Sequence, residues 1–156
     1  MLKITGDFIG KVKSGLDLSK RGRANYNIHK DYNDPVQRLF NIANKATYVR
    51  PHKHENPDKL EIFVILKGRI LLVEFDDSGN VTDYVVLDKE KGNFAVEIPP
   101  RVWHSFICLE DGSCLYEIKQ GPYILKTDKN FAPWAPEEFS GEARLYNKKI
   151  LLQLSL

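Results

Sequence analysis

The stretch YVRPHKHENPDKLEIFVILKG, residues 48–68, carries two histidines separated by a single residue. In a β-strand, residues two apart point to the same face, so His52 and His54 can reach one ion. The turn ENPD reverses the chain, and Glu61 opens the next apolar run, where its carboxylate can lie beside the two imidazoles. Downstream, the stretch EIPPRVWHSF places His104 just after a proline turn, at the start of another expected strand. Three imidazoles and one carboxylate from three strands form a ligand set suited to one divalent transition metal.

The H-x-H pair alone has a simpler explanation, because such a pair is often a solvated strand end. Three further features favour a metal site: the carboxylate at the expected place, the closing glycine Gly68, and the later proline–histidine turn. The residue types do not choose the metal, since imidazole and carboxylate suit zinc, iron, nickel, manganese and copper alike. We therefore expect one divalent transition metal, such as Zn, Fe, Ni or Mn, as the cofactor.

Length and composition indicate an ordinary globular domain. The chain has 156 residues, of which 42% are hydrophobic and 28% charged, so residues 1–156 can form one domain with a sizeable core. A net charge of +2 gives no basis for a nucleic-acid partner, and no apolar run approaches the ~20 residues of a membrane helix. The N-terminus lacks a signal-peptide core, and Cys108 and Cys114 form no disulfide framework, which together predict a cytoplasmic protein.

Short apolar runs separated by turn residues predict an all-β domain. The runs KLEIFVIL, RILLVEF, VTDYVVL, FAVEI and WHSFICL are rich in Val, Ile, Phe and Tyr, and turns such as DDSGN and EDGS separate them. This succession favours a sandwich or barrel, because parallel βαβ packing would need long helical crossovers, and the sequence shows none between these runs.

One helix is predicted at about residues 35–44 and a second within residues 5–20. In NDPVQRLFNIANK, Asp34 suits an N-cap, Pro35 suits the first helical position, and apolar residues recur at helical spacing. The remaining expected parts are an N-terminal extension at about 1–33, a barrel at about 45–121, and a C-terminal segment at 122–156 that wraps the outside.

The histidine pattern resembles the two motifs of the cupin superfamily, G-x5-H-x-H-x3,4-E-x6-G and P-x-G-x-x-H. The first motif is matched by His52, His54, Glu61 and Gly68. Its leading glycine is absent, with Ala46 nearest to that position, and the gap before the glutamate is longer by a couple of residues. All the ligand types of the motif are nevertheless present.

The second motif is matched by Pro99 and His104, but Arg101 stands where glycine is usual, which puts the shape of that turn in question. A wider resemblance, from about residue 21 to 138, runs through RGRANYNIH, DPVQRLFN, TYVRPHKH, PPRVWHSF, EIKQGPY and FAPWAPEE. These segments look like WbuC-type cupin-fold metalloproteins. That resemblance implies a single-domain cupin, a double-stranded β-helix or jelly-roll barrel with one or two short N-terminal helices and a buried metal. It also implies a link to O-antigen type surface-polysaccharide genes, but it supplies no reaction.

Glu117 and Lys119 are candidates for the wall of the barrel cavity. If the loop EDGS joins a hairpin, Phe106 lies opposite Glu117 and His104 lies opposite Lys119, and directly opposed residues share a face. Buried charges must pair or do chemistry. Glu117 is therefore either a proton-transfer group or a structural partner of Lys119, and a one-residue change in the loop would turn both outward.

Arg50 and Tyr48 share the face of the histidines if the strand alternation extends backwards from His52. A guanidinium there can grip a carboxylate or phosphate that also approaches the metal, with Lys119 as a second cation. It can equally pair with an inward carboxylate. Tyr48 can donate a proton to a ligand or simply pack.

Asn25, Asn27 and His29 alternate in the stretch KRGRANYNIHK, so a strand would place all three on one face. In a barrel with a polar mouth they would hydrogen-bond a hydroxyl-rich ligand. On an edge strand they would face solvent instead.

Two functions fit these features. The first is an enzyme, such as a metal-dependent isomerase, lyase or dioxygenase, in which Glu117 or Tyr48 moves a proton. Its substrate would be a small polar, sugar-like or anionic molecule of surface-polysaccharide metabolism. The second is a non-catalytic module that binds or senses such a molecule through the metal and Arg50. A purely structural metal in an apolar cavity is a third reading. The apolar outer positions Ile62 and Val64 also make a homodimer an expectation.

Overall fold

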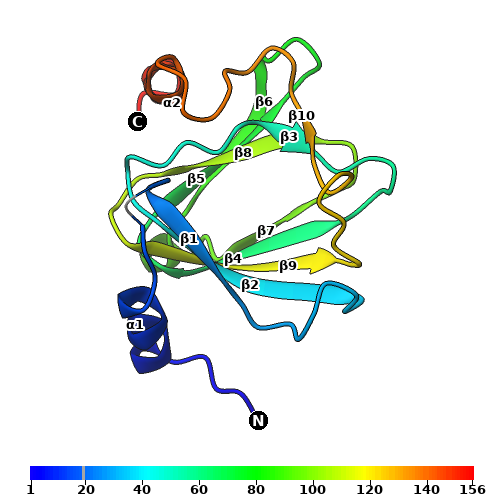
Figure 1. The fold of residues 1–156 in the computed structure, drawn as a ribbon. Coiled ribbons are helices and arrows are strands. Elements are labelled where there is room, and N and C mark those ends of the chain that lie inside the picture. Colours follow the sequence, from blue (N-terminus) through cyan, green and yellow to red (C-terminus); the bar gives the residue numbers. More distant parts are fainter. Residues whose placement is uncertain (19) are drawn as a thin grey trace.

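Two five-stranded antiparallel sheets face each other in the computed structural model, which describes residues 1–18 and 20–156 (Figure 1). The first sheet contains, in spatial order, β1 (Arg23–Asn27), β2 (Val36–Ala43), β9 (Ser113–Gln120), β4 (Glu61–Lys67) and β7 (Ala95–Ile98). The second contains β10 (Asn130–Phe131), β3 (His52–Lys53), β8 (Trp103–Cys108), β5 (Ile70–Phe75) and β6 (Val81–Leu87). The chain repeatedly crosses from one sheet to the other, which is the jelly-roll arrangement of a cupin and confirms the predicted fold class.

The space between the sheets is apolar at one end and polar at the other. Alternation along β4 shows how the core forms: Phe63 and Ile65 are buried, whereas Ile62 and Val64 are only partly buried. The inner cluster comprises Ala43, Val49, Phe63, Ile65, Ile70, Leu72, Leu87, Ile98, Phe106, Cys108 and Leu115. Because these side chains fill one end of the barrel, the other end is left to polar residues and holds the cavity described below.

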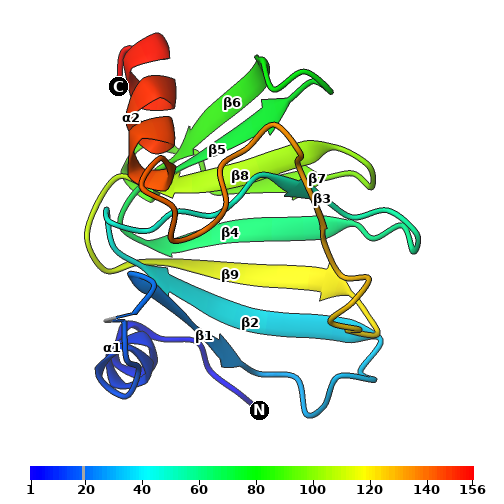
Figure 2. The ribbon, with the colours of Figure 1, turned by 45° about the horizontal axis from the view of Figure 1, so that its top comes forward.

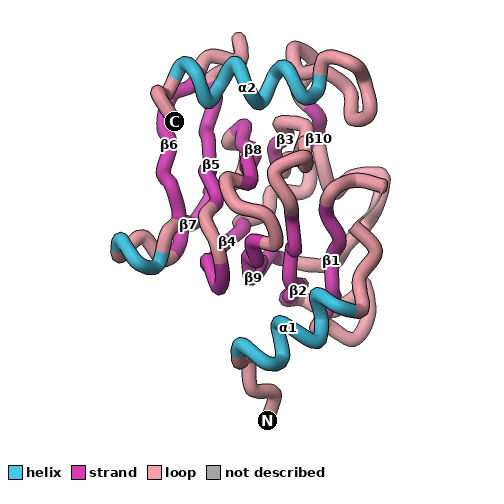
Figure 3. Tube along the Cα trace, turned by 90° about the vertical axis from the view of Figure 1, so that its left-hand side faces the viewer, coloured by secondary structure: helices cyan, strands magenta, loops and turns pink. Residues whose placement is uncertain are grey.

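Each sheet is covered on its outer face by one helix (Figure 2). α1 (Gly6–Ser14) lies within the predicted helix at residues 5–20 and packs Ile9 and Val12 against outward side chains of β2. α2 (Ala143–Gln153), which the sequence pattern does not predict, packs Ile150 against outward side chains of β5 and β8 (Figure 3). A short 3-10 turn, η1 (Lys89–Lys91), lies between β6 and β7. Among the described residues, neither α-helix combines the length and apolar composition that crossing a membrane requires.

The predicted helix at residues 35–44 is wrong, because these residues form β2, which pairs with β1 and β9. Phe40 and Ile42 point outward and are covered by α1, while alternate residues line the inner face. A strand buried on both faces is apolar without a two-residue period, so its apolar positions can coincide with helical spacing. Asp34 caps no helix; its carboxylate accepts from the amide of Val36 at 3.1 Å, in a turn ahead of the strand.

Candidate metal centre

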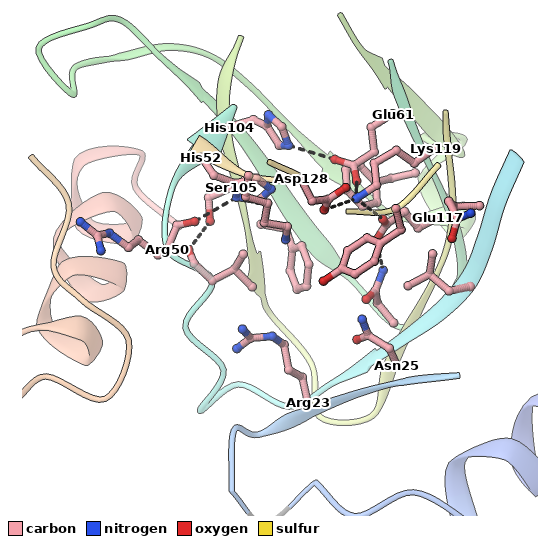
Figure 4. A pocket seen from close by; sticks show the side chains of 18 of the residues that line it. Arg23, Asn25, Arg50, His52, Glu61, His104, Ser105, Glu117, Lys119 and Asp128 are labelled. Atoms are coloured by element: carbon pink, nitrogen blue, oxygen red, sulfur yellow. Dashed lines mark hydrogen bonds and ion pairs between the residues drawn. The ribbon is translucent and has the colours of Figure 1, made fainter. Parts of the chain in front are cut away.

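Three strands bring the four predicted metal-ligating residues to one point inside the barrel; Figure 4 shows three of them, His52, Glu61 and His104. His52 lies on β3 opposite His104 of β8, and Glu61 begins β4 on the facing sheet. His54 follows β3 and reaches the same point. One ligand atom from each of the four lies within 4.8 Å of the others. All four residues are at most 3% exposed, so the group is a buried cluster and not a surface coincidence.

The backbone determines which nitrogen of each imidazole carries the proton. Nδ1 of His52 and Nδ1 of His104 each donate to the carbonyl two residues earlier, at 3.0 and 2.9 Å. Nδ1 of His54 donates to the carbonyl of Asp128. Because a carbonyl can only accept, each neutral ring keeps its lone pair on Nε2.

The three Nε2 atoms gather around Glu61. Nε2 of His104 and Nε2 of His54 lie 3.0 and 3.3 Å from Oε2 of Glu61, and Nε2 of His52 has no hydrogen-bond partner among the described residues. Lone pairs aimed at a buried carboxylate repel it unless a cation lies between them. Three neutral imidazoles and one carboxylate are donors that a divalent transition metal accepts, so the residues present fit such an ion.

Burial and neighbouring charges keep His52 and Glu61 in the protonation states that bind metal. Burial lowers the pKa of His52 well below its usual value, and the charge of Lys129 adds to that effect, so this ring is neutral at neutral pH. Burial alone would raise the pKa of Glu61, but the charge of Lys119 opposes it, and that pKa lies well below its usual value. Glu61 is therefore a carboxylate.

Two left-handed backbone positions fall in the segments that match the cupin motifs. Arg101 stands where the cupin motif has glycine, yet it adopts a left-handed conformation, with φ of 68°. Its amide donates to the carbonyl of His54 at 3.0 Å, and its guanidinium pairs with Asp58 at 3.0 Å. A tight left-handed turn is therefore present without the glycine. At Gly68, φ is 73°, and a Cβ there would overlap the side chain of Ser113, which explains the closing glycine.

The metal centre forms part of the wall of a cavity of about 500 Å3 between the two sheets. His52, Glu61 and His104 face this cavity. A volume of this size is in the range of small-molecule sites. A ligand in the cavity would therefore meet the open side of the metal centre, as a catalytic or ligand-binding metal requires.

Glu117 and Lys119 line the same cavity, as the sequence predicts. The strand that pairs with theirs, however, is not the predicted one. The predicted hairpin between the strands of His104 and Glu117 is wrong, because β8 and β9 belong to different sheets. β9 pairs instead with β4, which sets Lys119 opposite Glu61 and Glu117 opposite Phe63. The loop between β8 and β9 crosses between the sheets, and alternation along β9 turns both side chains inward without the hairpin.

A dense group of charges surrounds Lys119. Its ammonium lies 2.8 Å from the carboxylate of Asp128 and 3.7 Å from those of Glu61 and Glu117. Burial would lower the pKa of Lys119, but these carboxylates outweigh it and raise that pKa above its usual value. Burial, together with the charge of Glu61, raises the pKa of Glu117 to about 8, and Asn41 donates to its Oε2 at 2.6 Å. Glu117 thus carries a proton at neutral pH beside the metal centre.

Arg50 borders the cavity, but neither its guanidinium nor the hydroxyl of Tyr48 faces the metal centre, which corrects two expectations. β3 begins only at His52, so its alternation does not extend back to these residues. The guanidinium of Arg50 donates to the carbonyl of Ala132 at 3.1 Å and points away from the imidazoles (Figure 4). The hydroxyl of Tyr48 donates to the carbonyl of Pro136 at 2.8 Å, and burial raises the pKa of Tyr48 above its usual value. Tyr48 therefore packs under the C-terminal segment and is no proton donor to the cavity.

Asn25, Asn27 and His29 line the cavity along β1 and the residues after it. Figure 4 shows Asn25 across from the metal centre. The backbone amide of Arg38 lies 3.0 Å from Nδ1 of His29. Nε2 of His29 is buried and has no partner among the described residues. This nitrogen and the two side-chain amides are polar groups that a ligand could satisfy.

Asp128, Lys129 and Asn41 also belong to the cavity wall, and the sequence analysis misses all three. Asp128 bridges two buried lysines, with its carboxylate 3.1 Å from Lys59 and 2.8 Å from Lys119. No local pattern marks Asp128 or Lys129, because they reach the site only through the pairing of β10 with β3. For Asn41, the available signal is a polar residue within the otherwise apolar run at residues 39–43.

Comparisons with known proteins agree with this fold. Residues 4–87 match the model of a family described as a domain of unknown function, DUF6016. No curated protein matches the chain. The capsular polysaccharide assembling protein CapF from Staphylococcus aureus is similar in structure, with 19% identity, a TM-score of 0.59 and coverage of 74% of this chain. The similarity covers only 30% of the CapF chain.

Two further solved structures match over most of their own length. KdgF from Halomonas sp. is 16% identical, with a TM-score of 0.52 and coverage of 71% of this chain and 87% of its own. Protein SO0799 from Shewanella oneidensis is 15% identical, with a TM-score of 0.59 and coverage of 97% and 96%. At these identities the likeness shows the shared cupin fold and carries no activity with it.

Proposed function

We infer that this chain, which belongs to the DUF6016 family of domains of unknown function, is a metal-dependent enzyme acting on a small polar, sugar-like molecule. The observation that carries this proposal is that the Nε2 lone pairs of the imidazoles surround the carboxylate of Glu61. This cluster is also accessible to a ligand, because His52, Glu61 and His104 face the cavity. His52, His54, Glu61 and His104 would hold one divalent ion, of which Zn, Fe, Ni and Mn all accept these donors.

Glu117 supplies the proton chemistry in this proposal. When bound, the metal would polarise a carbonyl or hydroxyl of the ligand. Asn41 occupies Oε2 of Glu117, so the proton would be held or released at Oε1. The positive charge of a metal at Glu61 would lower the pKa of Glu117 from about 8 toward neutrality, where a general acid or base works best.

A polar, hydroxyl-rich ligand fits the far wall of the cavity. The side-chain amides of Asn25 and Asn27 and the unpartnered Nε2 of His29 would hydrogen-bond sugar hydroxyls. The WbuC-type resemblance and the similarity to CapF, a capsular polysaccharide assembling protein, support a ligand from surface-polysaccharide metabolism. We keep a cytoplasmic location and a homodimer as predictions, to be checked by cell fractionation and light scattering.

The test begins with metal analysis of protein purified without an affinity tag. Metal-loaded parent is then incubated with pooled sugars, sugar acids and sugar phosphates, and the products are followed by NMR. Glu117→Gln should keep the metal and lose turnover by roughly 10²–10⁴-fold, the usual contribution of general acid–base catalysis. Glu97→Gln, an exposed glutamate on β7, is the matched control and should behave as the parent.

Three results would contradict parts of the proposal. A parent that binds no divalent metal would refute the metal centre. Parent-like turnover in Glu117→Gln would exclude its role in proton transfer. Ligands that bind without being converted, in parent and variant alike, would identify a binding module that uses the same cavity without chemistry.

A further inference from the structure

Lys129 lies on the cavity wall beside the candidate metal centre. Antiparallel pairing sets Phe131 of β10 opposite His52 and Asn130 opposite Lys53. Lys129 directly precedes β10 and lines the same cavity as His52. Its charge acts on the His52 imidazole, which places the ammonium near the metal centre.

The backbone that carries Lys129 is held in place on both sides. The carboxylate of the preceding residue, Asp128, pairs with the ammonium groups of Lys59 and Lys119, and the carbonyl of Asp128 accepts from His54. The following residue, Asn130, begins β10, and its amide side chain donates to the carbonyl of Glu55 at 2.7 Å. The ammonium of Lys129 is thus carried on a fixed support next to a metal-ligating residue.

Lys129 differs from the other cations of the cavity in forming no ion pair among the described residues, although Glu61, Glu117 and Asp128 act on its charge at longer range. Arg21 and Arg23 share Glu138, both at 2.9 Å, and Lys119 is paired with Asp128 at 2.8 Å. Within the described part of the chain, no carboxylate oxygen lies within 4.0 Å of the Lys129 ammonium. A metal held by Glu61 and neutral imidazoles would add further positive charge to the same wall.

We propose that Lys129 and the open side of the metal centre form a subsite for an anionic group, so that the ligand is an acidic or phosphorylated sugar-like molecule. The inference rests on the proposed function and names its substrate class. An anion in the cavity would offer one oxygen to the metal side and another to the Lys129 ammonium, as a charge-assisted hydrogen bond. Arg50 cannot fill this role, because its guanidinium is turned to the carbonyl of Ala132.

The experiment measures binding and needs no turnover. Metal-loaded protein is titrated calorimetrically with glucuronate, glucose 6-phosphate and glucose, which present a carboxylate, a phosphate and no anion on one carbon skeleton. The proteins are the parent, Lys129→Met, Lys129→Arg and Lys126→Met. Lys126 is exposed in the same loop and does not line the cavity, so it controls for a general loss of positive charge. Metal content is measured for every protein before ligand is added.

We expect the parent to bind at least one of the two anions more tightly than glucose. Lys129→Met should weaken that binding by about 10- to 100-fold, the scale of one hydrogen bond to a charged group, with metal content unchanged. Lys129→Arg should keep most of the affinity, and Lys126→Met all of it. The preferred anion then decides between a carboxylate and a phosphate.

The inference fails if the loaded parent prefers neither anion over glucose, or if Lys129→Met binds as tightly as Lys126→Met. Either result leaves the metal centre and the proposed function standing. A parent without metal defeats the proposed function itself, and the preceding metal analysis separates that case from the other two.

Discussion

Replacing Asp128 by asparagine tests whether the buried charge network supports the cavity wall. The carboxylate of Asp128 is 3% exposed and lies 3.1 Å from the ammonium of Lys59 and 2.8 Å from that of Lys119. Those two lysines are 2% and 5% exposed, so water cannot replace the lost carboxylate. The Asp128→Asn variant keeps the size of the side chain and removes only its negative charge.

The expected loss in the free energy of unfolding is about 3–5 kcal/mol, the cost of leaving a buried charge without its partner. Total stabilities of domains are about 5–15 kcal/mol, so this loss would be a large fraction of the whole. The carbonyl of residue 128 still accepts from His54 in the variant, so metal binding should survive wherever the protein is folded.

The pH dependence of the stability difference between parent and Asp128→Asn provides a second test. Burial would raise the pKa of Asp128, but Lys119 and Lys59 outweigh it and lower that pKa below its usual value. A depressed carboxyl pKa contributes stability that is present above the unfolded value of about 3.9 and is lost as pH falls through the folded value. The difference in stability between parent and Asp128→Asn should therefore be largest near neutral pH and shrink below about pH 4.

The assay is urea denaturation of both proteins in excess chelator, which removes any stabilisation by bound metal. Asp58→Asn is the matched control, because Asp58 pairs with Arg101 at a similar distance, 3.0 Å, but on the surface. Surface ion pairs contribute little, so the control should unfold close to the parent. If Asp128→Asn costs no more than Asp58→Asn, the buried network does not stabilise the fold.

Three other predictions concern metal binding, Tyr48 and Gly68. Protons compete with metal for the imidazoles, so metal retained after dialysis should fall cooperatively as pH drops through and below the usual histidine range, because the pKa of His52 is lowered, and full retention down to about pH 4 would argue against histidine ligands. Tyr48→Phe should cost about 0.5–1.5 kcal/mol through the lost hydrogen bond to Pro136, measured by urea denaturation, with bound metal unchanged. If that variant loses turnover while its metal content stays at the parent level, Tyr48 takes part in the reaction. Gly68→Ala should lower stability by roughly 1–3 kcal/mol, because φ is 73° and a Cβ would overlap Ser113; an unshifted denaturation midpoint would contradict this.

Several features could be predicted because they depend on chemistry and spacing within a few residues. His52 and His54 lie two apart, so a short extended segment is enough to aim both imidazoles the same way. Glu61 begins β4 and His104 is the second residue of β8, each after a turn that the sequence marks clearly. The all-β class follows in the same way from strand composition and turn residues.

Other features could not be predicted because they depend on which strands become neighbours. The apolar spacing of residues 36–43 fits a helix, and only the covering of both strand faces by α1 and the barrel interior makes it β2. Arg50 turns away from the metal centre because regular alternation begins only at β3. Glu117 points inward through pairing with β4, not through the expected hairpin with β8.

The sequence by itself determined the four candidate metal ligands and the class of fold, since local alternation and turn chemistry are properties of short segments. Only the tertiary structure decided what surrounds the ligands. Lys129 and Asp128 lie far from His54 along the chain and meet it because β10 pairs with β3. The charge that a ligand would encounter in the cavity is therefore set by long-range strand pairing, whose register no local pattern specifies.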